Sequence, residues 1–257
     1  MHAIYRVDGN RAVTHADAAG PWDPRMQHGS APSALAVWAA EAIPTREPMQ
    51  IARVTIDLMR PVPVAPLTIE TEILREGRKI QLCAVRLRAE DVVVVVATVL
   101  KIKAQALSLP AEAVDQPVGF PGPDQCRVET PDFSGSPFVR GISMRAARGG
   151  FGVPGPGAIW YRVDRPLVEG AAISQAMRAV VASDLCNGTS AALDFQKWTF
   201  INADLSVNLA RQPVGDWILL DAESLIGPDG AGLACARLAD INGTFGRVAQ
   251  SLVIEKR

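Results

Sequence analysis

Apolar and polar residues alternate along the chain in a way that divides it into two similar halves. In the first half, apolar residues at helical spacing predict a helix over residues 29–43, capped by Ser30 or Ser33 and ended by Pro44. A short strand over residues 4–7, followed by a loop, precedes this helix. Period-two alternation between turn residues then predicts four strands, over residues 51–59, 67–74, 78–88 and 92–103.

The second half repeats this plan. An apolar stripe predicts a helix over residues 171–184, which ends on Asp184, and the following pair Asn187-Gly188 favours a helix stop. Residues 105–136 are proline-rich with little periodicity, so we expect a linker between the halves. The strands predicted around the second helix are residues 138–148, 158–163, 198–209, 216–226, 232–238 and 245–255.

The two halves also contain segments of similar sequence at matching places, residues 54–62 and residues 204–214, and we call this similarity the sequence echo. A repeat of one helix plus four strands predicts an α+β fold of two tandem modules, residues 1–104 and 137–257. Each module is expected to be a curved antiparallel sheet wrapped around its central helix. Joining the two sheets side by side would remove exposed edge strands, which invite aggregation.

Composition and charge narrow the function classes. The chain has 257 residues, 48% of them hydrophobic, and a net charge of −1, which favours neither nucleic acid nor an anionic membrane as a partner. No apolar run reaches the roughly 18 residues of a membrane span, and the N-terminus shows no signal-peptide pattern. The four cysteines are scattered and the three histidines fall within the first 28 residues, so we expect no metal site and reduced thiols in a cytoplasmic protein.

Two motifs that suggest other chemistries are excluded by their context. Residues 150–155 fit G-x-G-x-x-G but contain a proline and lead into a predicted strand, whereas dinucleotide binding needs a helix N-terminus there. No G-x-S-x-G motif occurs, which argues against an α/β-hydrolase.

Asp184 is the candidate catalytic carboxylate. The sequence leaves two interpretations open, a general base or a polar residue near a helix C-terminus, where the helix dipole disfavours a negative charge. Burial among alanines and valines is expected to raise the pKa of Asp184. Glu41 lies at a similar position in the first helix and is interpreted as a surface acid.

Four motifs in order resemble the double hot-dog acyl-CoA thioesterases, a group related to bacterial acyl-CoA thioesterase II. The first lies around the N-terminal helix, where Gly20-Pro21-Trp22-Asp23 is followed by His28-Gly29 and by Pro32-Ser33-Ala34-Leu35. The others are Trp198-Thr199-Phe200-Ile201-Asn202-Ala203-Asp204-Leu205, Gly227-Pro228-Asp229-Gly230-Ala231-Gly232-Leu233-Ala234 and Gly246-Arg247-Val248-Ala249-Gln250-Ser251-Leu252. The resemblance covers nearly the whole chain outside the linker.

The resemblance implies hydrolysis of acyl-CoA to a free fatty acid and CoA by a water that a helix Asp, a strand Thr and a strand Gln position. Asp184 and Gln250 match the Asp and the Gln. The Thr position falls on Ile201 or Asn202, and we prefer Asn202 because its amide can orient water.

The resemblance also implies a substrate-binding role for the start of the first helix, where His28, Gly29 and Ser30 match a turn whose N–H groups face the thioester carbonyl. Thr199 is a further candidate for substrate binding. No cofactor is implied, the expected partner is acyl-CoA, and a homo-oligomer, most simply a dimer, is expected by analogy.

Several alternatives stay open. Asp184 could attack the thioester directly and form an anhydride. The protein could instead bind acyl-CoA or lipid without catalysis. An acyl-thioester hydratase or dehydratase is a third possibility, but it needs a paired Asp and His, and the second helix contains no His. The sequence does not define the acyl-chain length or the carrier, and it does not say which of Arg60, Arg88, Lys101, Lys103, Arg211 and Arg247 meets CoA phosphates.

Overall fold

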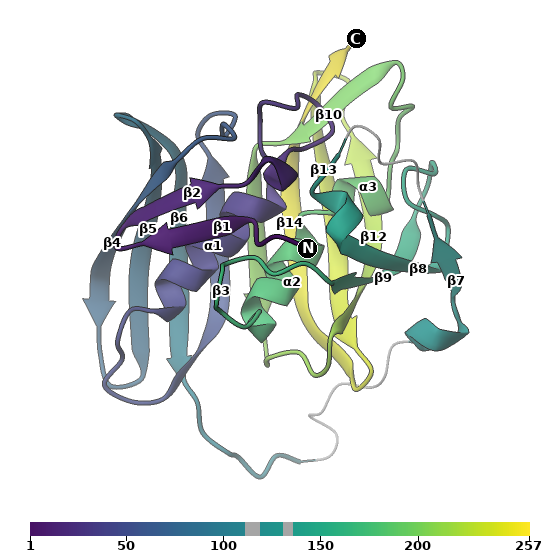
Figure 1. Ribbon diagram of the computed structural model, residues 1–257. Helices are drawn as coiled ribbons and strands as arrows, with labels where there is room; N and C mark the ends of the chain where they lie inside the picture. The colour runs from purple at the N-terminus through teal and green to yellow at the C-terminus, as the bar shows by residue number, and fades with distance from the viewer. Residues whose placement is uncertain (111–118, 131–135) are drawn as a thin grey trace.

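One continuous antiparallel sheet curves around two central helices. The computed structural model describes residues 1–110, 119–130 and 136–257. The main path of the sheet runs β1-β2-β4-β5-β6-β3-β11-β14-β13-β12-β9-β8-β7, and β10 pairs with β14 beside this path (Figure 1). This is the α+β, double hot-dog arrangement that the sequence predicts, with one helix enclosed by each half of the sheet.

The N-terminal half contains the predicted helix and its four strands, together with an additional hairpin. The helix begins one residue later than predicted and ends two residues earlier. A second short strand follows the predicted N-terminal one, where the sequence suggested only a loop. The elements are β1 Tyr5–Asp8, β2 Arg11–Thr14, η1 Ala16–Ala18, α1 Ser30–Glu41, β3 Met49–Leu58, β4 Leu67–Glu76, β5 Ile80–Ala89 and β6 Val92–Lys103.

The C-terminal half repeats the plan with more irregular elements. Most of its strands lie close to the predicted ranges, and α2 begins four residues later than predicted. Residues 139–141, predicted as strand, form η4, and α3 was not predicted. Within the predicted linker, η3 and β7 form, and β7 pairs with β8. Residues 111–118 and 131–135 of that linker lie outside the described residues. The elements are η3 Pro123–Gln125, β7 Arg127–Glu129, η4 Val139–Gly141, β8 Ile142–Arg148, β9 Gly157–Val163, α2 Gln175–Ser183, α3 Cys186–Thr189, β10 Trp198–Asn202, β11 Asp204–Leu209, β12 Trp217–Ile226, β13 Ala231–Asp240 and β14 Gly243–Lys256.

The two halves join through β3 and β11, the strands that carry the sequence echo. These strands pair antiparallel, with Val54 opposite Val207 and Ile56 opposite Leu205, and all four side chains are fully or almost fully buried. Edge-to-edge pairing satisfies the backbone of both strands and continues one apolar core across the junction. The prediction that the sheets join side by side is therefore confirmed.

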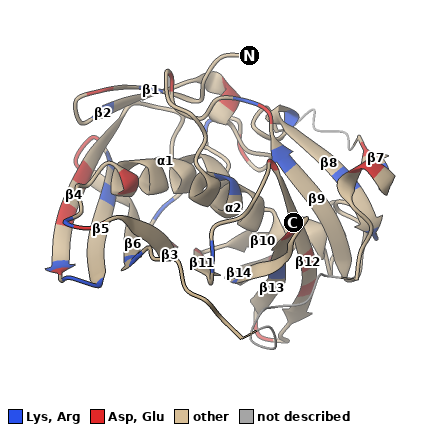
Figure 2. Ribbon diagram, turned by 90° about the horizontal axis from the view of Figure 1, so that it is seen from below, with Lys and Arg blue, Asp and Glu red and all other residues tan. Residues whose placement is uncertain are grey.

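The two helices lie together inside the curve of the sheet, as Figure 2 shows from below. Helix α1 is not the one-sided helix that its predicted stripe suggested, because it is buried on nearly every side apart from Trp38, Glu41 and the exposed Ala42 after it. An alanine-rich helix has little side-chain bulk, which allows α2 to pack closely against it. The N-terminus of α1 thereby meets the C-terminus of α2.

Three local predictions are wrong, and two of them concern this helix junction. Neither Ser30 nor Ser33 caps α1, because Gly29 is the N-cap residue. The Ser30 hydroxyl donates to Asp184 at the end of α2, and the Ser33 hydroxyl donates to the backbone oxygen of Gly29. The pair Asn187-Gly188 does not stop a helix but lies inside α3. The predicted strand over residues 198–209 is broken at Ala203, so that β10 pairs with β14 alone whereas β11 also pairs with β3.

The four cysteines form no disulfide, and Cys83, Cys126 and Cys186 are buried. In the described ranges, no helix combines the length and the apolar character needed to cross a bilayer.

Candidate functional site

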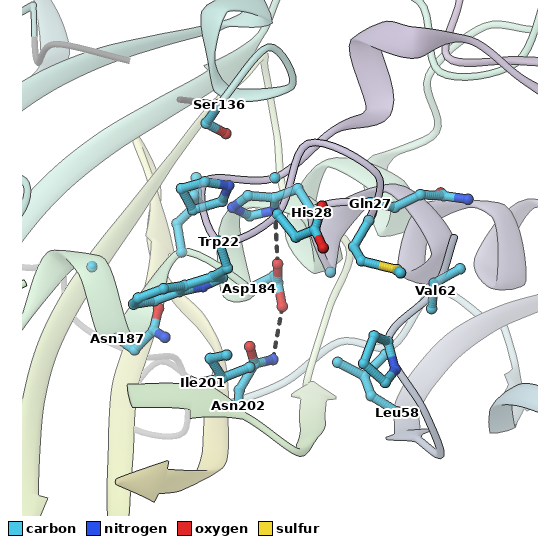
Figure 3. Close-up of a pocket in the computed structure, with 18 of the residues that line it drawn as sticks. Trp22, Gln27, His28, Leu58, Val62, Ser136, Asp184, Asn187, Ile201 and Asn202 are labelled. Atoms are coloured by element: carbon cyan, nitrogen blue, oxygen red, sulfur yellow. Dashed lines mark hydrogen bonds and ion pairs between the residues drawn. The ribbon is translucent and has the colours of Figure 1, made fainter. Parts of the chain in front are cut away.

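A cavity of about 880 Å³ opens where the two modules meet. Its walls come from the loop before α1, from the end of β3, from the turn between α2 and α3, and from the end of β10 (Figure 3). Most of its lining is apolar, and Asp184 and His28 face each other within it (Figure 3). An apolar cavity with a few convergent polar groups is typical of a ligand site.

Asp184 is the C-cap residue of α2 and is 3% exposed. Its position at a helix C-terminus is electrostatically poor, but the carboxylate also lies against the N-terminus of α1, where the dipole is favourable. Contact is so close that a Cβ built on Gly29 would lie 2.8 Å from Asp184 Oδ1. Helix packing therefore supplies the positive field that the sequence around Asp184 lacks.

Three side chains donate to the Asp184 carboxylate. Ser30 Oγ lies 2.9 Å from Oδ2, and His28 Nδ1 lies 3.1 Å from the same oxygen. Asn202 Nδ2 donates to Oδ1 at 2.9 Å. The donors come from both modules, so this site exists only in the assembled double module.

The pKa of Asp184 is lower than that of an ordinary aspartic acid, contrary to the sequence-based expectation. Burial raises the pKa, as expected, but the hydrogen bond and charge of His28 and the hydrogen bonds from Ser30 and Asn202 outweigh it. The expectation considered only the apolar neighbours of Asp184 in sequence. At neutral pH the group is a buried, ionised carboxylate.

The His28 imidazole has two contacts at the same nitrogen. Nδ1 lies 3.1 Å from Asp184 Oδ2 and 3.2 Å from the backbone nitrogen of Ser30. One nitrogen cannot donate to the first and accept from the second, and a buried carboxylate is the stronger partner. We therefore assign a proton to Nδ1. Phe138 stacks on the ring, with 5.1 Å between centroids, and holds its orientation. Ser30 itself is fully buried outside the cavity lining, so its expected substrate-binding role has no geometric support.

The break in the predicted long strand explains how Asn202 reaches the site. Asn202 is the last residue of β10, and its side chain turns to Asp184 just before the chain resumes as β11. Strand alternation places Thr199 on the opposite face from Phe200 and Asn202. Thr199 does not line the cavity, so the expected substrate-binding role has no geometric support.

Gln250 is fully buried on β14 and lies behind the cavity wall. Its Nε2 donates to the backbone oxygen of Asp184 at 3.3 Å, and its Oε1 accepts from the backbone nitrogen of Asn187 at 3.2 Å. Both polar ends of the amide are thus engaged by the turn between α2 and α3. This placement fits positioning of Asp184 better than direct contact with a substrate.

Glu41 lies at the end of α1, exposed and outside the cavity lining, but it is not a simple solvated acid, because partial desolvation raises its pKa and Ser174 donates a hydrogen bond to it.

The aromatic part of the cavity was missed in the sequence, apart from Trp22 in the first motif. Trp22 stacks on Phe195, with 5.7 Å between centroids, and Phe151 lines the wall nearby. Phe151 lies in the glycine-rich turn of residues 150–155, and it packs against Gly188. Only the fold brings these residues together, so no local pattern could have identified them.

Comparison with family profiles shows which protein family the chain belongs to. The profile described as the acyl-CoA thioesterase N-terminal domain matches residues 18–102, and that of the C-terminal domain matches residues 117–254. The chain belongs to the acyl-CoA thioesterase family. Membership of this family makes it a thioester hydrolase, with acyl-CoA as the substrate class, and agrees with the resemblance seen in its motifs.

Solved structures share the fold of this chain over nearly its whole length. A proposed thioesterase II from Thermobifida fusca YX is 17% identical, with a TM-score of 0.77 over 97% of this chain and 94% of that one. A hot-dog protein from Alicyclobacillus acidocaldarius is 16% identical, with a TM-score of 0.75 over 98% and 95%. The tesB protein of Mycobacterium avium subs. paratuberculosis is 20% identical, with a TM-score of 0.71 over 98% and 96%. No curated protein sequence matches the chain.

Proposed function

We propose that this thioesterase cleaves acyl-CoA with a water molecule that Asp184 activates and Asn202 orients. One observation carries the proposal. Asp184 is a buried carboxylate in which Oδ2 has two protein donors, whereas Oδ1 has only Asn202 among the described residues. A carboxylate oxygen accepts more than one hydrogen bond, so Oδ1 has room for a water.

In the proposed step, Asp184 takes a proton from this water while the water oxygen bonds to the thioester carbon. The carbonyl oxygen becomes an oxyanion. When the tetrahedral intermediate collapses, the carbon–sulfur bond breaks and the proton on Asp184 passes to the leaving CoA sulfur. The products are a fatty acid and CoA, and Asp184 returns to its ionised form.

The start of α1 provides donors for the oxyanion. Gly29, the N-cap residue of α1, lines the cavity, and its backbone N–H belongs to the helix end whose amides have no partner within the helix. The absence of a side chain at Gly29 allows close approach to the Asp184 carboxylate. Gln250 acts in this scheme through the backbone of Asp184, as a positioning residue.

The direct test is thiol release from acyl-CoAs of short to long chain by the wild-type protein. We expect turnover on part of the series, because the cavity is apolar and of finite size. Binding of acyl-CoA without thiol release at any chain length would contradict the proposal and indicate a binding protein.

The His28 contact predicts a shift in the pH profile. Because His28 lowers the pKa of Asp184, we expect the acidic limb of kcat/KM in the wild type to fall below the ordinary aspartate value of about 3.9. In His28→Gln the pKa of Asp184 rises, so activity is lost at a higher pH than in the wild type. His15→Gln is the matched control, because His15 contacts Asp17 and does not line the cavity. An acidic limb that stays in place in His28→Gln would exclude this electrostatic role.

The His28–Asp184 pair is also the observation that favours a hydratase or dehydratase. The second helix contains no histidine, but the fold brings His28 of the first module to Asp184. Hydration of a 2-enoyl-CoA without thiol release would reveal it.

A cytoplasmic homodimer remains a prediction.

A further inference from the structure

Among the described residues that line the cavity, Arg60 is the only lysine or arginine. The two acids in the lining are Asp184 and Asp23, and Asp23 already pairs with Arg25 at 2.7 Å. A carrier that delivers an acyl group through a phosphorylated pantetheine arm brings several negative charges to this opening. A cation near the mouth of the cavity would bind such a ligand through charge-assisted hydrogen bonds.

The other basic residues that the sequence offers for a phosphate are engaged or lie elsewhere. Outside that set, Arg257 stacks on Trp22 of the lining, with its guanidinium carbon 5.0 Å from the ring centroid. Lys101 is 3% exposed and donates to the backbone oxygen of Ile43 at 2.9 Å. Arg247 is exposed in a separate groove formed by β11 to β14 and their neighbours. The remaining three have partners of their own, which are Glu70 for Arg88, Glu47 for Lys103 and Asp240 for Arg211.

A backbone hydrogen bond holds the segment that carries Arg60 next to the segment that carries Asn202. Arg60 follows β3 by two residues, and the N–H of Leu58 donates to the oxygen of Ala203 at 2.9 Å, directly beside Asn202. Pro61 follows Arg60 and restricts its backbone. The Arg60 side chain is exposed, and the structure records no ion pair or hydrogen bond between its guanidinium and another described residue.

We propose that Arg60 binds a phosphate group of the acyl carrier at the mouth of the cavity. A guanidinium presents paired N–H donors that match phosphate oxygens, and its charge is constant with pH. The exposed Met59 beside it adds an apolar surface for the uncharged part of the carrier. This inference rests on the proposed hydrolysis of acyl thioesters. The phosphate belongs to CoA or to a protein-bound phosphopantetheine, and the two sources are separable by experiment.

The test compares Arg60→Ala with Arg247→Ala, which removes the same charge from the separate groove. With acyl-CoA, we expect Arg60→Ala to raise KM by about 10-fold, the effect of one lost charge-assisted hydrogen bond, and to leave kcat unchanged. Arg247→Ala should behave as the wild type. With the same acyl group on pantetheine, which carries no phosphate, Arg60→Ala and the wild type should have equal KM values.

Three further substrates identify the phosphate source. Acyl-dephospho-CoA and acyl-phosphopantetheine lack successive phosphates of CoA, and an acyl-acyl carrier protein presents phosphopantetheine on a protein. A penalty that persists on acyl-phosphopantetheine and on the protein-bound substrate supports contact with the phosphate next to pantetheine. A penalty confined to acyl-CoA supports contact with the phosphate on the ribose.

Two results would overturn the inference while leaving the hydrolysis intact. One is an equal KM for Arg60→Ala and Arg247→Ala on acyl-CoA. The other is an Arg60→Ala penalty that is as large on acyl-pantetheine, which would show a role in cavity shape rather than phosphate binding. A wild-type protein that hydrolyses neither acyl-CoA nor acyl-pantetheine would instead contradict the proposed function.

Discussion

Asp184→Asn is expected to lower kcat for acyl-CoA hydrolysis by at least about 10²-fold, the contribution of a general base. The amide has nearly the same shape as the carboxylate but cannot take a proton from water. Its NH₂ group also meets a site in which Ser30, His28 and Asn202 all donate. Initial rates of thiol release, measured at saturating acyl-CoA, give kcat directly.

Loss of stability must be separated from loss of the base. Asp240→Asn is a matched control, because Asp240 is 1% exposed, accepts from Arg211, and lies outside the cavity lining. We expect Asp240→Asn to lower the melting temperature and to keep kcat, whereas Asp184→Asn should lose kcat while remaining folded. An Asp184→Asn protein with wild-type kcat would remove Asp184 from the chemistry.

The architecture was predictable because it depends on repeated, local patterns. Alternation in each half specified the strands, and the echo between residues 54–62 and 204–214 marked the two strands that now pair as β3 and β11. Irregular features escaped prediction because tertiary contacts produce them. The break at Ala203 is one example, since it separates a strand that pairs with β14 alone from one that pairs with β3 as well.

The site was predictable only as far as the motifs reach. The predicted helix and the family resemblance nominated Asp184, the resemblance nominated Asn202, and the structure brings these residues into contact. The contact of His28 with Asp184 joins residues from different modules, and the predicted N-cap Ser30 serves the carboxylate instead. Both roles follow from packing the start of α1 against the end of α2, which no spacing in the sequence encodes. The same packing reversed the expected direction of the Asp184 pKa.

Gly29→Ala is expected to reduce kcat by roughly 10²-fold, comparable to the loss of a general base, without unfolding the protein. Gly29 has φ −54° and ψ −31°, which alanine adopts readily, so backbone conformation does not require glycine here. Space does require it. A Cβ at this position would lie 2.8 Å from Asp184 Oδ1 and 3.0 Å from Oδ2, so the carboxylate has to move.

The displaced carboxylate would lose its alignment with Asn202 and with the bound water, and small errors of position are costly in catalysis. Gly122→Ala is the matched control, because φ at Gly122 is −63° and a Cβ there would have no neighbour within 4 Å. Thermal melting and kcat are measured on both variants. A Gly29→Ala protein that melts like the wild type yet turns over slowly would show that Gly29 is required for the position of Asp184. Wild-type kcat in this variant would mean that the carboxylate can move without cost, which contradicts the tight arrangement on which the proposed mechanism depends.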